Sequence, residues 1–94
     1  MKSNWTKEEN EICSRYFLRT YVIEKRSLPL SAAAAELHDL LPARSESTLR
    51  MKLSNCKALS IENGLTDTAP FSALENTSFD HRVAFGRMIK DLGL

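Results

Sequence analysis

Four consecutive alanines at residues 32–35, bounded by Pro29 and Pro42, constrain the fold of this chain more than any other feature. Alanine has the highest intrinsic helix propensity, whereas proline disfavours helix at the residue before it and interrupts a helix that reaches it. The segment therefore predicts a short helix that begins after Pro29, has Ser31 as its N-cap and stops at Pro42. Three leucines supply its expected buried stripe: Leu37, Leu40 and Leu41.

An earlier helix is predicted from Trp5 to about Lys25. Thr6 and Glu9 have the spacing of a capping box, in which a hydroxyl and a carboxylate satisfy free backbone N–H groups at a helix start. Apolar residues recur behind them at spacings of three and four, which indicates one amphipathic helix. These residues are Ile12, Cys13, Tyr16, Phe17, Tyr21 and Val22.

Ser45 is the expected N-cap of a third helix, which runs to about Leu59. On a helical wheel Leu49, Leu53 and Cys56 share one face, so this face is predicted to point into the core. The residues predicted to point away from the core are Ser47, Arg50, Met51, Ser54, Asn55 and Ala58.

Residues 65–77 show no sustained period and include a proline, so they predict an irregular connection, anchored by Phe71 and Leu74. Helical spacing returns over residues 78–92. Its apolar residues form two strips, more than one core contact requires, so one strip is expected to face a partner. The first strip consists of Phe79, Val83 and Gly86, and the second of Phe85, Met88, Ile89 and Leu92.

Together these segments predict an all-α fold in one domain, 1–94. It consists of a trihelical helix-turn-helix core at about 6–59, an irregular segment and a C-terminal helix at about 78–92. The 94 residues are 43% hydrophobic and 27% charged, as in an ordinary globular domain. Because neither a secretory leader nor an apolar run of about 18 residues is found, and the two cysteines are widely separated, we expect a reduced, cytoplasmic protein without a membrane partner.

A net charge of +1 neither demands nor excludes a nucleic-acid partner, so a case for DNA depends on local charge. Residues 44–57 carry a local charge of +3, and in a helix-turn-helix the second helix enters the major groove. The expected phosphate contacts are Arg44, Lys52 and Lys57. The residues expected to approach the bases are Ser47, Arg50, Met51, Ser54 and Asn55. The competing interpretation is a charged face of an ordinary helical bundle.

The opening Trp5-Thr6-Lys7-Glu8-Glu9 resembles the start of Myb/SANT-like trihelical domains. Together with the stretch centred on Met51-Lys52-Leu53-Ser54-Asn55, it more closely resembles the small N-terminal domain that precedes HNH nuclease modules in restriction-endonuclease-like bacterial proteins. Gly64-Leu65 and the segment from Phe79 to Phe85 are similar to the later part of that family's domain.

This resemblance implies binding of double-stranded DNA. The 94 residues contain no HNH motif, so it does not imply nuclease activity, and we expect no enzyme and no small-molecule substrate. A mobile-element protein and a restriction-associated accessory protein are both compatible with it. The alternative from another class is a protein-interaction module, an adaptor or a homodimer formed through the C-terminal helix, without nucleic-acid binding.

The potential metal ligands Cys13, His38, Cys56 and His81 are separated by 25, 18 and 25 residues. Structural zinc sites use closely spaced pairs, so this spacing predicts no metal site, no bound zinc and no cofactor. Both cysteines fall on apolar stripes and are expected to be small buried hydrophobic residues. A Cys–His pair would require the fold to bring one of the histidines to one of the cysteines.

Overall fold

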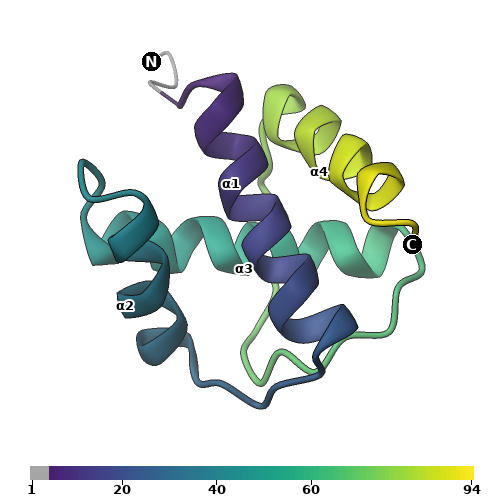
Figure 1. The fold of residues 1–94 in the computed structure, drawn as a ribbon, viewed down its shortest axis with the longest axis horizontal. Helices are drawn as coiled ribbons and strands as arrows, with labels where there is room; N and C mark the ends of the chain where they lie inside the picture. The colour runs from purple at the N-terminus through teal and green to yellow at the C-terminus, as the bar shows by residue number, and fades with distance from the viewer. Residues whose placement is uncertain (1–4) are drawn as a thin grey trace.

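The computed structural model describes residues 5–94, and all their regular structure is helical (Figure 1). The predicted all-α fold is therefore confirmed. Helix α1 spans Lys7–Phe17 and continues as a π-helical stretch, η1, over Leu18–Ile23. The later helices are α2 (Leu30–Leu40), α3 (Glu46–Glu62) and α4 (Phe79–Asp91).

Side-chain caps fix where the helices begin. The Thr6 hydroxyl accepts from the Glu9 backbone N–H and the Glu9 carboxylate accepts from the Thr6 N–H, both at 3.1 Å, which confirms the capping box. Ser45 caps α3 through the Thr48 N–H, as predicted. Helix α2 differs, because Pro29 is its N-cap and the helix begins at Leu30, before the predicted cap Ser31.

The core lies where α1 crosses α3, with α2 packed on α3 and α4 packed mainly on α1 (Figure 1). The predicted stripe of α3 is confirmed, since Leu49, Leu53 and Cys56 are fully buried. Leu40 was expected in the core of α2, but its side chain is 56% exposed. The helix ends at Leu40, and the following Leu41 leaves helical geometry and takes the buried position.

The segment 65–77 is irregular, as predicted, and it lies against the helices. Phe71 packs edge-on against Tyr21, with the ring centroids 5.5 Å apart. The Thr68 N–H donates to the Tyr21 carbonyl at 3.0 Å. The side chain of Leu74 is exposed rather than anchored in the core, and its backbone N–H instead donates to the Ser54 carbonyl.

None of the helices described is long and apolar enough to span a bilayer.

Candidate functional site

The outward side of α3 carries four of the five residues predicted to approach DNA bases. Ser47 and Met51 are exposed, with 58% of Met51 accessible, and Arg50 and Ser54 are partly exposed. Arg50 makes no hydrogen bond or ion pair within residues 5–94. This strip therefore offers a guanidinium group, hydroxyl groups and a thioether to a partner.

Asn55, the fifth predicted residue, lies on a different side of the helix. Its amide donates to the Leu74 carbonyl at 2.6 Å, and only 8% of the residue is exposed. The prediction that Asn55 points to solvent is wrong because segment 65–77 folds back along α3 and covers this position. Asn55 therefore holds the irregular segment in place.

Lys52 was expected at a phosphate but lies inside the protein. Its Nζ is 4.6 Å from the centroid of the Trp5 ring, and burial lowers the pKa of this amine. The wheel places Lys52 beside Leu53, toward α1, and Trp5 closes over it from the start of that helix. The structure thus uses this cation in a cation–π contact.

The other two expected phosphate contacts are paired with carboxylates. Arg44 donates to both oxygens of Glu9, and its Nη2 lies 2.6 Å from Oε1. Lys57 Nζ lies 2.7 Å from Oδ1 of Asp67, whose side chain is only 3% exposed. The local charge of +3 over residues 44–57 is therefore largely neutralised within the fold.

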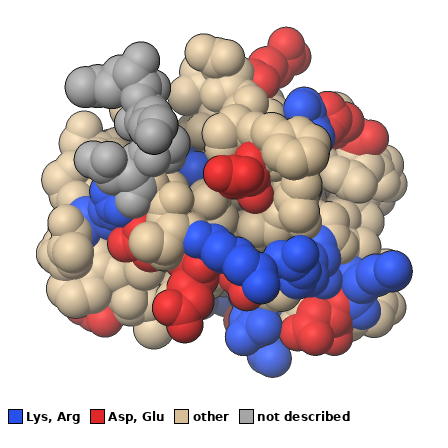
Figure 2. All heavy atoms as spheres, turned by 90° about the horizontal axis from the view of Figure 1, so that it is seen from above, with Lys and Arg blue, Asp and Glu red and all other residues tan. Residues whose placement is uncertain are grey.

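The remaining surface also mixes charges of both signs. On the face seen in Figure 2, Lys and Arg side chains are interspersed with Asp and Glu. Three ion pairs link helices at the protein surface. They join Arg15 to Asp91, Arg82 to Glu62 and Arg87 to Glu11.

The two apolar strips of α4 have different environments. Phe85 and Met88 are buried against the core, whereas 74% of Phe79 and 39% of Val83 are exposed. Phe79 and Val83 also line a shallow hollow with Lys7 from α1. In the outer strip Phe79 is therefore largely exposed, whereas Val83 and Gly86 are partly covered.

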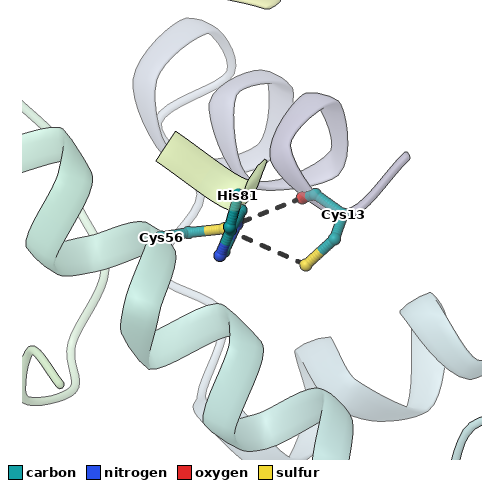
Figure 3. Close-up of side chains that lie close together, drawn as sticks. All are labelled: Cys13, Cys56 and His81. Carbon is teal, nitrogen blue, oxygen red and sulfur yellow. Dashed lines mark hydrogen bonds between the residues drawn. The ribbon is translucent and has the colours of Figure 1, made fainter. Parts of the chain in front are cut away.

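A buried cluster lies where α1, α3 and α4 meet, and it contains Cys13, Cys56 and His81 (Figure 3). The two Sγ atoms are 3.9 Å apart, and Cys56 Sγ is 3.4 Å from His81 Nε2. All three residues are fully buried. Burial lowers the pKa of His81 to about 3 and raises that of the Cys56 thiol, so both groups are neutral in the absence of an ion.

Sequence spacing missed this cluster because its members come from three helices. Their apolar environment gave the only signal, since Cys13 and Cys56 were each expected on a buried stripe. The fold does bring a histidine to a cysteine, His81 to Cys56, while His38 lies apart and bonds to the Arg44 carbonyl. The spacing argument against a metal site therefore does not apply to these three residues.

No protein-family model, curated protein or solved structure matches this chain. Support for a function comes from the side chains themselves, because one helical architecture serves many functions.

Proposed function

We propose that this protein binds double-stranded DNA through the outward strip of α3, Ser47, Arg50, Met51 and Ser54, without catalysing a reaction. The observation that carries the proposal is the position of Arg50. It lies on the exposed side of the second helix of a closely joined pair, α2 and α3, and no carboxylate among residues 5–94 neutralises it. An arginine in this position can pair with guanine in the major groove.

The arrangement of the helices leaves this strip accessible. Helix α4 packs mainly on α1, and α2 lies at the N-terminal end of α3, joined to it through residues 41–45 (Figure 1). In the proposal, this order of helix, turn and helix serves as a helix-turn-helix, with the outward strip of α3 facing the major groove.

Phosphate contacts in this proposal come from fewer cations than the sequence suggested. The backbone N–H groups of Glu46 and Ser47 and the Ser47 hydroxyl are suitable donors, because helix N-termini and hydroxyl groups commonly contact phosphates; the Thr48 N–H is already bonded to Ser45. With Arg44, Lys52 and Lys57 engaged inside the protein, affinity for random DNA should be modest. A cytoplasmic location is part of the proposal and fits the two free thiols.

Fluorescence anisotropy with a pool of random-sequence duplexes, at about 50 and 200 mM salt, tests the proposal. We expect binding at the lower concentration and weaker binding at the higher one. The matched variants are Arg50→Ala and Arg19→Ala, which remove the same charge from α3 and from the exposed surface of η1. On a duplex selected from this pool for tight binding, only Arg50→Ala should reduce binding. Absence of binding at low salt, or equal losses in both variants, would contradict the proposal.

A second candidate function is association with a second copy of the chain through α4. Its support is the exposure of Phe79 and Val83 on one side of a helix whose other side is already packed. Large exposed aromatic groups are typical of interfaces between proteins. Sedimentation of the wild type and of Phe79→Ser across a range of concentrations tests it. A dimer that Phe79→Ser dissociates supports this function, and a monomeric wild type at all concentrations rules it out.

A further inference from the structure

We propose that Cys13, Cys56 and His81 bind one thiophilic d10 metal ion, Zn²⁺ or Cu⁺, at the junction of α1, α3 and α4. The site would be held by two thiolates and one imidazole. It is distinct from the outward strip of α3 and independent of DNA binding. Thiolate and imidazole are the ligands that these two ions share.

Two of the three distances within the cluster match those of a ligand set. With zinc–sulfur bonds of about 2.3 Å and zinc–nitrogen bonds of about 2.0 Å, tetrahedral angles put two sulfurs about 3.8 Å apart and a sulfur and a nitrogen about 3.5 Å apart. The Cys13 and Cys56 sulfurs are separated by 3.9 Å, and Cys56 Sγ and His81 Nε2 by 3.4 Å. All three ligand atoms lie within 4.8 Å of one another, so a small side-chain movement closes the set around one ion.

Two buried polar atoms at or near this junction lack hydrogen-bond partners among residues 5–94. His81 is fully buried and its Nδ1 has no hydrogen-bond partner. Asn10, one turn before Cys13 on α1, has a buried Oδ1 that is also without a partner. No neighbour among the described residues fixes the tautomer of His81 through Nδ1, so Nε2, the nitrogen that lies 3.4 Å from Cys56 Sγ, is available as the ligand atom.

Lys52 adds a charge argument. It is buried beside Trp5 and forms no ion pair with a carboxylate within the described part of the chain; the Glu9 carboxylate and, when ionised, Cys13 and Cys56 stabilise its charged form. Two thiolates with Cu⁺ carry one net negative charge, which would compensate this ammonium, whereas two thiolates with Zn²⁺ are neutral. The presence of three ligands rather than four also favours Cu⁺, because structural zinc sites take four.

Ion binding must displace the two thiol protons, which pass to solvent as each sulfur forms its bond to the metal. No oxidation or reduction takes place in this step. The protein must therefore be fully reduced and kept free of oxygen during the experiment, so that Cys13 and Cys56 stay available as thiols.

The experiment titrates the reduced protein with Zn²⁺ and, separately, with Cu⁺, each in competition with a chromophoric chelator. We expect one equivalent to bind, together with a sulfur-to-metal charge-transfer band in the ultraviolet and a rise in melting temperature. Cu⁺ should bind more tightly than Zn²⁺. Binding of Zn²⁺ alone would overturn the preference for Cu⁺ while supporting the site.

Cys13→Ala and Cys56→Ala test the ligands one at a time, and circular dichroism checks that each variant is folded. Each should weaken binding by more than the roughly tenfold that the loss of an outer-shell partner costs. His38→Ala is the matched control, because this histidine lies outside the cluster and should bind the ion as the wild type does. A wild type that binds neither ion, or folded cysteine variants that bind as tightly as the wild type, would overturn the site.

Discussion

Arg44 forms a two-pronged ion pair with Glu9, with Nε donating to Oε2 at 3.1 Å and Nη2 to Oε1 at 2.6 Å. The same guanidinium lies 4.8 Å from the centroid of the Trp5 ring. The pair joins the start of α1 to the turn before α3. Glu9 also completes the cap of α1 and thus stabilises both a helix start and a tertiary contact.

This arrangement predicts an acid-sensitive contribution to stability. The hydrogen bond from Arg44 is the largest of the effects that hold the Glu9 pKa below its usual value of 4.5. A lowered folded pKa adds stability that is present above the unfolded value and is lost as the pH falls through the folded value. Glu9→Gln should therefore be less stable than the wild type at neutral pH, and the difference should shrink in acid. Urea unfolding at pH 7 and pH 3 measures it. A difference that is constant with pH would contradict this role of Glu9.

The buried stripe of α3 predicts a large effect at Leu53 and a small one at Met51. Leu53 is fully buried, so Leu53→Ala should lower the free energy of unfolding by about 2 to 5 kcal/mol. Met51→Ala, two residues away and on the exposed side, should change it by less than about 0.5 kcal/mol. Denaturant unfolding of both variants makes the comparison. Similar losses would show that the orientation of α3 is wrong.

Local signals in the sequence predicted much of this fold. The capping box at Thr6 and the N-cap at Ser45 depend on residues within three positions, and both helix starts were predicted correctly. Helical periodicity predicted the buried side of α3, because Leu49 and Leu53 repeat along one face.

Local signals could not predict which side chains are buried by distant parts of the chain. Lys52 and Asn55 are polar, and neighbouring residues gave no sign that Trp5 and segment 65–77 would cover them. Burial of a polar residue depends on the partner that reaches it from elsewhere in the chain. The Cys13, Cys56 and His81 cluster was missed for the same reason, since spacing along the chain says little about helices that cross.

Replacement of Asp67 should destabilise the protein more than replacement of any other carboxylate in segment 65–77. The Asp67 side chain is 3% exposed and accepts hydrogen bonds from Lys57, the Ser60 hydroxyl and the Ala69 N–H. Asp67→Ala leaves the ammonium of Lys57 without its carboxylate and should cost about 3 to 5 kcal/mol of stability. Asp39→Ala, at an exposed position of α2, is the control and should stay within about 0.5 kcal/mol of the wild type. Equal, small effects in thermal or urea unfolding would show that segment 65–77 is not held by this pair.

The last prediction separates a base contact from a phosphate contact at Arg50. If Arg50 pairs with guanine, Arg50→Ala should cost about 1 to 3 kcal/mol on a duplex selected for tight binding and much less on random DNA, because only the selected duplex offers the two-pronged partner. If Arg50 contacts phosphate, the loss of binding free energy should be equal on both duplexes. The slope of the logarithm of the binding constant against the logarithm of the salt concentration should then fall by about one unit. Titrations of wild type and variant on both duplexes at several salt concentrations decide between them. We expect the first result, because Arg50 lies on the same outward strip as Ser47 and Ser54, whose hydroxyl groups can also reach base edges. Unchanged binding on both duplexes would leave α3 as an ordinary solvent-exposed helix.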